Sequence, residues 1–210
     1  MEKLKSSITN MALVLTGVAV ITGGILAYVN HATEGPIAEQ NKLTLQNGIK
    51  SVMGGGDLTV SKTDTVRQND AKGKELTYII YQTQDKQQKD LGAAVESTTG
   101  GFGGDLKVLV GFDPEGNILG YTILAHAETP GLGAKADKWF QKGEKGDIIG
   151  KNPAEELQVS KDGGKVDAIT ASTITSRAFL LAVNNAYKAY KATPVDGATG
   201  ATKQEKEDKE

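Results

Sequence analysis

Five hydroxyl side chains are crowded into seven positions just before a helix-forming segment. They belong to Thr170, Ser172, Thr173, Thr175 and Ser176. Residues 166–169 predict a short strand, so the cluster falls where a helix begins. A helix N-terminus presents unpaired N–H groups and the positive end of the dipole, which favour a phosphate, and Arg177 can add a bidentate contact. The pattern predicts a phosphate-binding site that contains a nucleophilic hydroxyl, although a Ser/Thr helix cap with extra hydroxyl groups explains the pattern as well.

A second candidate segment is the loop HAETPGLG at residues 126–133. Pro130 removes a backbone donor and fixes φ, while the two glycines permit conformations that other residues resist. Taken alone, these residues predict a tight structural loop with the carboxylate of Glu128 and the hydroxyl of Thr129 at its base.

The elements that must position these segments begin with a hairpin. Residues 105–112 alternate apolar and polar side chains, DPEGN predicts a turn, and residues 118–125 predict the returning strand. Further strands are predicted at 76–81 and 92–97, and helices at 134–140 and 174–190. The fold class predicted is α+β with a mainly antiparallel sheet.

The N-terminal segment predicts a membrane anchor. Residues 8–29 are almost uncharged, and about 20 apolar residues suffice for a helix to cross a bilayer. Lys3 and Lys5 precede this run, which places the N-terminus in the cytoplasm and the domain on the periplasmic or outer face. A cleaved signal peptide is the alternative, but the run is long and no A-x-A site follows it.

The chain is therefore divided into four parts. Residues 1–30 are the cytoplasmic N-terminus and transmembrane helix, 31–57 a connecting helix, 58–192 a single domain, and 193–210 a disordered charged tail. Two GAT triplets in the tail lack a strand before them and a helix after them, so they are not taken as sites.

Composition excludes several kinds of chemistry. Without cysteine, the chain has no disulfides, thiolate zinc sites or cysteine-ligated iron–sulfur clusters. Two histidines, His31 and His126, are too few for a histidine-rich metal or haem site, so no metal ligand is assigned. Redox chemistry would need an organic cofactor. A net charge of -2 and a pI near 5.8 argue against nucleic acid as a partner.

The sequence DAITASTITS at residues 167–176 resembles the D-x-I-S-G-A-T-x-T-S motif of FMN-binding domains that hold their flavin covalently. In that family the FMN phosphate is esterified to the last threonine of S-G-A-T, which makes Thr173 the acceptor. This chain differs at three of those four positions, with Thr170 for Ser, Ala171 for Gly and Ser172 for Ala. Alanine tolerates fewer backbone conformations than glycine.

The loop at residues 126–133 matches the second signature of the same family, H-x-E-T-P-G-L-G, throughout. The resemblance implies that Glu128, Thr129 and Leu132 lie near the isoalloxazine ring. It also implies that Ser176 and the local amides orient the phosphate and that Arg177 adds charge. A glycine-rich loop at residues 98–104 is either a flexible hairpin connection or a further flavin contact.

Over most of its length, the chain resembles the G subunits of Rnf electron-transport complexes. The resemblance implies a bacterial inner-membrane complex that moves electrons between ferredoxin and NAD and translocates Na⁺ or H⁺. This subunit would relay electrons through one covalent FMN, with other Rnf subunits as partners and no complete activity alone. A separate Mg²⁺-dependent flavin transferase, using FAD, would attach the flavin, so no catalytic residue is expected.

Two alternatives are open. The related C subunit of the Na⁺-translocating NADH:quinone reductase shares both motifs, although the compact middle of this chain favours the Rnf subunit. A membrane-anchored scaffold or binding domain that never receives flavin is the other.

Overall fold

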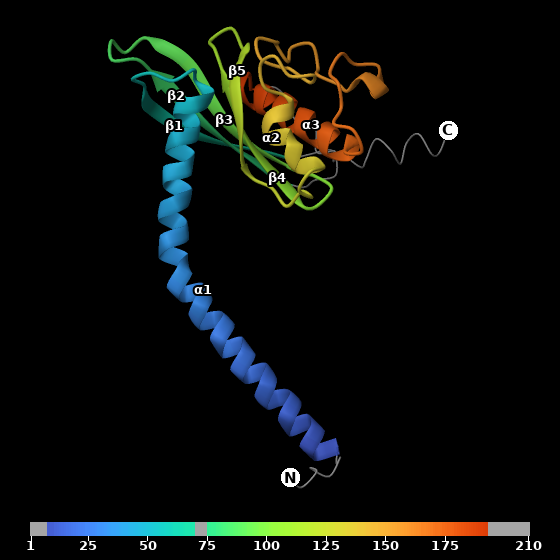
Figure 1. Cartoon of the computed structure of the whole chain (residues 1–210). Coiled ribbons are helices and arrows are strands. Elements are labelled where there is room, and N and C mark those ends of the chain that lie inside the picture. The colour runs from blue at the N-terminus through green and yellow to red at the C-terminus, as the bar shows by residue number, and fades with distance from the viewer. Residues whose placement is uncertain (1–7, 70–74, 193–210) are drawn as a thin grey trace. The chain divides into compact units, whose positions relative to one another are not determined.

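The structure, a computed structural model, describes residues 8–69 and 75–192 (Figure 1). The chain divides into two units, one ending at Thr44 and one beginning at Leu45. The predicted tail, with its two GAT triplets, and Lys3 and Lys5 lie outside the described residues.

The first helix, α1 (Ile8–Val52), runs for 45 residues and contains Pro36. From Ile8 to Val29 its large apolar side chains are exposed. At 1.5 Å per residue this stretch is roughly 33 Å long, enough to cross a hydrocarbon core of about 30 Å. By length and composition, α1 therefore has the properties of a single-pass membrane anchor.

The domain is built on one sheet whose strands follow sequence order. They are β1 (Thr59–Asn69), β2 (Glu75–Gln84), β3 (Asp90–Gly100), β4 (Asp105–Phe112) and β5 (Ile118–Ala125), and each neighbouring pair is antiparallel. Alternation directs Leu106, Val108, Val110 and Phe112 of β4 to one face, where all four are fully buried. The predicted α+β class with an antiparallel sheet is confirmed.

Helix α3 (Thr173–Tyr190) covers that buried face. Phe179 of this helix stacks on Phe140 with ring centroids 4.3 Å apart and meets Tyr121 edge-on at 4.7 Å. Thr99 Oγ1 of β3 donates to the Ala178 carbonyl at 2.9 Å, which ties the first half of α3 to the sheet. The core thus fixes the N-terminal end of α3 relative to β3.

The other face of the sheet receives the last turns of α1. Ile49 and Val52 pack there with Met53, Ala94 and Leu109. A Cβ atom at Gly111 would lie 2.3 Å from the Val52 carbonyl oxygen, so the close approach of this helix end requires glycine.

The hairpin at residues 105–125 and the strands at 76–81 and 92–97 are confirmed, each of these two strands being longer than predicted. Strand β1 was not predicted, because its side chains are polar and largely exposed at the sheet edge. The strand predicted at 166–169 is wrong: only Val166 forms a bridge, parallel to Val159. The helix predicted at 134–140 consists of a 3₁₀ turn, η1 (Gly133–Lys135), followed by α2 (Ala136–Trp139).

Candidate functional site

A buried carboxylate joins three segments that are distant in sequence. Glu128 is 6% exposed. Its Oε1 accepts hydrogen bonds from the N–H groups of Phe102 (2.8 Å) and Gly103 (3.2 Å). Its Oε2 accepts the hydroxyl hydrogen of Thr175 at 2.7 Å. Glu128 therefore holds the glycine-rich loop and the first turn of α3 against its own loop.

Close packing around this carboxylate explains two glycines. A Cβ atom at Gly101 would lie 2.3 Å from Glu128 Oε1, and one at Gly133 would lie 2.2 Å from Oε2. The glycine-rich loop is therefore a fitted part of the site rather than only a flexible connection between β3 and β4.

The tight turn before α3 is held by Ser176. Its hydroxyl is fully buried, donates to the Ser172 carbonyl at 2.9 Å and accepts the Ile169 N–H at 2.9 Å. The Ser172 N–H also donates to the Ile169 carbonyl at 3.0 Å. Ala171, at φ +59°, occupies the left-handed region that glycine tolerates best.

Helix α3 begins at Thr173, and the residue before it, Ser172, makes no side-chain capping hydrogen bond. The plain Ser/Thr cap that the sequence allowed is therefore not how Ser172 is used. The N–H groups of the first turn are left without a side-chain cap, and such groups bind anions well.

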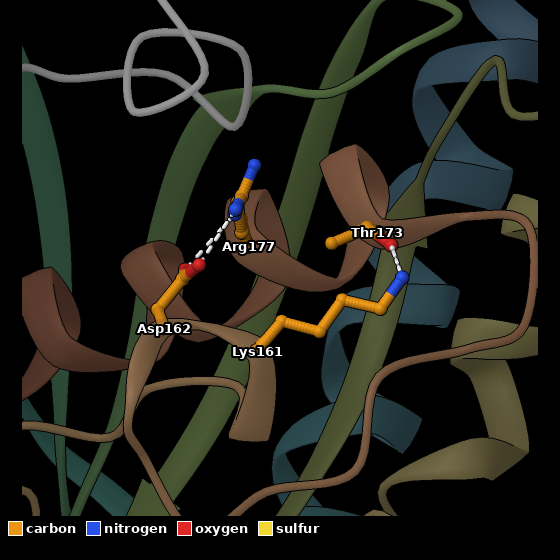
Figure 2. A network of polar contacts seen from close by, with 4 residues as sticks. All are labelled: Lys161, Asp162, Thr173 and Arg177. Atoms are coloured by element: carbon orange, nitrogen blue, oxygen red, sulfur yellow. Dashed lines mark hydrogen bonds and ion pairs between the residues drawn. The ribbon is translucent and has the colours of Figure 1, made fainter. Parts of the chain in front are cut away.

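Two basic side chains lie near this helix end, and Figure 2 shows their partners. Lys161 Nζ is 3.2 Å from Thr173 Oγ1. Arg177 donates through Nε and one terminal nitrogen to the two carboxylate oxygens of Asp162, at 2.9 and 2.6 Å. The side chains of this ion pair are only 11% and 8% exposed. The bidentate fork of Arg177, predicted to contact phosphate, is thus directed at Asp162.

These segments surround a pocket of about 510 Å³. Twelve residues line it: Phe102, Glu128, Thr129, Leu132, Gly133, Lys161, Ala171, Ser172, Thr173, Ile174, Thr175 and Arg177. Seven of the nine residues predicted from sequence are among them. The other two are Thr170, which is exposed, and Ser176, which braces the turn.

Sequence reasoning missed Lys161. It lies in a stretch rich in lysine, glycine and aspartate, where nothing distinguishes it from its neighbours. Only the fold brings it beside Thr173, twelve residues away. Asp162 was missed for the same reason, and Phe102 was considered only as part of a loop.

The lining suits a phosphorylated aromatic ligand such as FMN. A hydroxyl, an ammonium and an uncapped helix N-terminus match a phosphate, whereas Phe102, Leu132 and Ile174 offer apolar surface for a ring system. Phe102 and Leu132 are 70% and 42% exposed, so this apolar surface is open to a ligand.

The tyrosine Tyr121 fixes the segment that follows the 126–133 loop. Its hydroxyl donates to the Ala136 carbonyl at 2.7 Å and accepts the Phe140 N–H at 3.2 Å. Burial raises the pKa of Tyr121, which keeps the phenol neutral and able to donate.

Comparison with known proteins gives a consistent result. The FMN-binding domain family matches residues 101–188, and the family described as the RnfG N-terminal region matches residues 1–52. The G subunit of the ion-translocating oxidoreductase complex of Shewanella baltica is 32% identical over 192 residues, covering 87% of this chain and 89% of the relative. The protein of the same name from Yersinia pestis is 34% identical and covers 78% and 80%.

A relative from Clostridium ljungdahlii, the G subunit of the proton-translocating ferredoxin:NAD(+) oxidoreductase complex, is 31% identical over 88% of this chain and 92% of its own length. These relatives confirm the resemblance indicated by the two motifs. The chain belongs to the family of ion-translocating oxidoreductase complex G subunits.

Proposed function

We propose that this chain is the flavin-carrying G subunit of a membrane-bound ferredoxin:NAD oxidoreductase that translocates ions, with FMN attached through a phosphoester to Thr173. The observation that carries the proposal is the pocket beside Thr173. There, a hydroxyl, a cation and an uncapped helix N-terminus lie with apolar side chains in one cavity. When bound, FMN would supply electron transfer, which the side chains of this cysteine-free chain do not provide.

The residues of the chain would hold and orient the cofactor. Thr173 Oγ would carry the ester, and the first-turn N–H groups of α3 would face the phosphate. Thr129 and Leu132 would flank the ring, with Phe102 as a further apolar contact. Glu128, whose carboxylate oxygens are engaged by three protein donors, would keep these walls together.

The attachment would be made by a separate Mg²⁺-dependent transferase that uses FAD. The oxygen of Thr173 would form a bond to the phosphorus on the FMN side of the pyrophosphate. The bond to the AMP side would break, AMP would leave, and the hydroxyl proton would pass to the transferase or to solvent. No carboxylate or imidazole of the described residues is hydrogen-bonded to Thr173, which supports its role as a modified residue rather than an activated nucleophile.

The chain would be anchored by residues 1–30 in the bacterial inner membrane, with its N-terminus in the cytoplasm. A connecting segment at 31–57, helical as far as Val52, would lead to the FMN domain at 58–192 on the outer face, followed by the tail at 193–210. The apolar run at the start of α1 is long and no A-x-A site follows it, so an uncleaved anchor is favoured over a cleaved signal peptide. The other subunits of the complex would exchange electrons with the flavin.

The test is intact mass and ultraviolet in-gel fluorescence of the denatured full chain, produced with and without a flavin transferase. Transferase should add the mass of one FMN minus water and produce fluorescence. Thr173→Val should abolish both. Thr63→Val is the control, because Thr63 is exposed on β1, belongs to neither motif and does not line the pocket. An unmodified chain in the presence of active transferase would refute the proposal and favour a scaffold without flavin.

A further inference from the structure

The pocket beside Thr173 contains one cation whose charge is not neutralised by a carboxylate of the described residues. Two basic residues, Lys161 and Arg177, line the pocket. Arg177 is paired with Asp162 through two hydrogen bonds, of 2.9 and 2.6 Å. Lys161, by contrast, forms no ion pair with any carboxylate in the described ranges, and its ammonium contacts the hydroxyl of Thr173 at 3.2 Å.

The backbone that carries Lys161 is held from both sides. It belongs to the 3₁₀ turn η2 (Ser160–Asp162). On one side, the hydroxyl of Ser160 lies 3.0 Å from both the Val166 carbonyl and Asp167 Oδ1, and the Ser160 N–H donates to the same carbonyl at 2.8 Å. On the other side, the pair between Asp162 and Arg177 fastens η2 to α3, as Figure 2 shows.

We infer that Lys161 is the phosphate-binding cation of this site and that Arg177 is a positioning residue acting through Asp162. The inference rests on the proposed FMN function. A phosphate esterified at both ends carries one negative charge, and the ammonium of Lys161 already lies beside the oxygen that would bear the ester. The buried guanidinium of Arg177, whose fork is directed at a carboxylate, fixes η2 rather than supplying the neutralising charge.

The contribution of Lys161 can be separated from that of the flavin ring with two ligands. FMN and riboflavin share the ring, but only FMN has a phosphate. We would measure the affinity of the unmodified full chain in detergent for each ligand, by quenching of flavin fluorescence. Wild type should prefer FMN, and Lys161→Gln should reduce that preference about tenfold while leaving riboflavin affinity unchanged.

Variants of the same loop provide the controls. Lys161→Arg keeps the charge and should retain most of the preference for FMN. Lys165→Gln removes an equal charge from an exposed lysine that pairs with Glu155 and does not line this pocket, so it should behave as wild type. Added salt should weaken the preference in wild type more than in Lys161→Gln. Fluorescence of Trp139 would verify that each variant is folded.

Two outcomes would overturn the inference. The first is a Lys161→Gln variant that prefers FMN as strongly as wild type does. The second is a wild-type chain that does not distinguish FMN from riboflavin. In either case, transferase-dependent flavin on Thr173 in the same preparation would leave the proposed function intact, so the two failures are distinguishable.

Discussion

Replacing Ala171 with glycine should stabilise this protein, because the backbone at that position is left-handed. Ala171 has φ +59°, and its side chain is exposed, so removing the methyl group sacrifices no core contact. A left-handed conformation costs an L-residue about 1–2 kcal/mol. Glycine avoids this cost, but its greater freedom in the unfolded chain offsets about 0.4–1 kcal/mol. The difference between the two ranges is a rise in the unfolding free energy of about 0–1.6 kcal/mol, centred near about 0.8 kcal/mol.

The assay is urea unfolding of the full chain in detergent, followed by fluorescence of Trp139, the only tryptophan. Its indole N–H donates to the Asp167 carbonyl at 2.8 Å, close to the turn that contains Ala171. Ala154→Gly is the matched control, because Ala154 is also exposed but has no positive φ. The free energy of unfolding of Ala154→Gly should be lower than that of wild type by about 0.4–1 kcal/mol. If Ala171→Gly were destabilised like the control, the strain assigned to the turn would be refuted.

Two further predictions concern stability. Glu128→Ala leaves the N–H groups of Phe102 and Gly103 without their acceptor in a buried site, so urea unfolding should show a free energy of unfolding lower by about 2–3 kcal/mol. Glu128→Gln keeps an acceptor oxygen and should lower the free energy of unfolding by less. Although burial opposes it, hydrogen bonds from the side chain and backbone of Asn117 lower the pKa of Asp113. The stabilisation by Asp113 should therefore be complete at pH values well above 3.8, the ordinary pKa of the group, and should be lost as the pH falls below that pKa. Asp113→Ala should lower the unfolding free energy by about 1 kcal/mol at neutral pH. In acid, the unfolding curves of the variant and of wild type should converge.

Some features of this protein follow from local sequence alone. The hairpin at 105–125 was predictable because alternation and turn residues act over a few neighbouring positions, and the apolar run that begins α1 was predictable from composition. The two signatures led to seven residues that line the pocket, since they lie in two short contiguous stretches. The importance of residue 171 was also visible, because alanine replaces the glycine of the related motif.

Other features depend on tertiary packing. Strand β1 is polar and is held by its pairing with β2 at the sheet edge, so its own side chains give little sign of a strand. The 166–169 segment has strand-like residues, yet it lacks a neighbouring strand and forms only one bridge, at Val166.

The same distinction applies to the charges at the site. The sequence placed Arg177 near the predicted phosphate-binding site. It could not show that the guanidinium of Arg177 pairs with Asp162, or that Lys161 lies beside Thr173. These pairings join residues 12 and 15 positions apart through a loop without regular structure, so no periodic pattern encodes them. The motif in the sequence was enough to identify the residue that could carry the ester. Which cation lies beside that residue was settled by folding, because it depends on how η2 docks on α3.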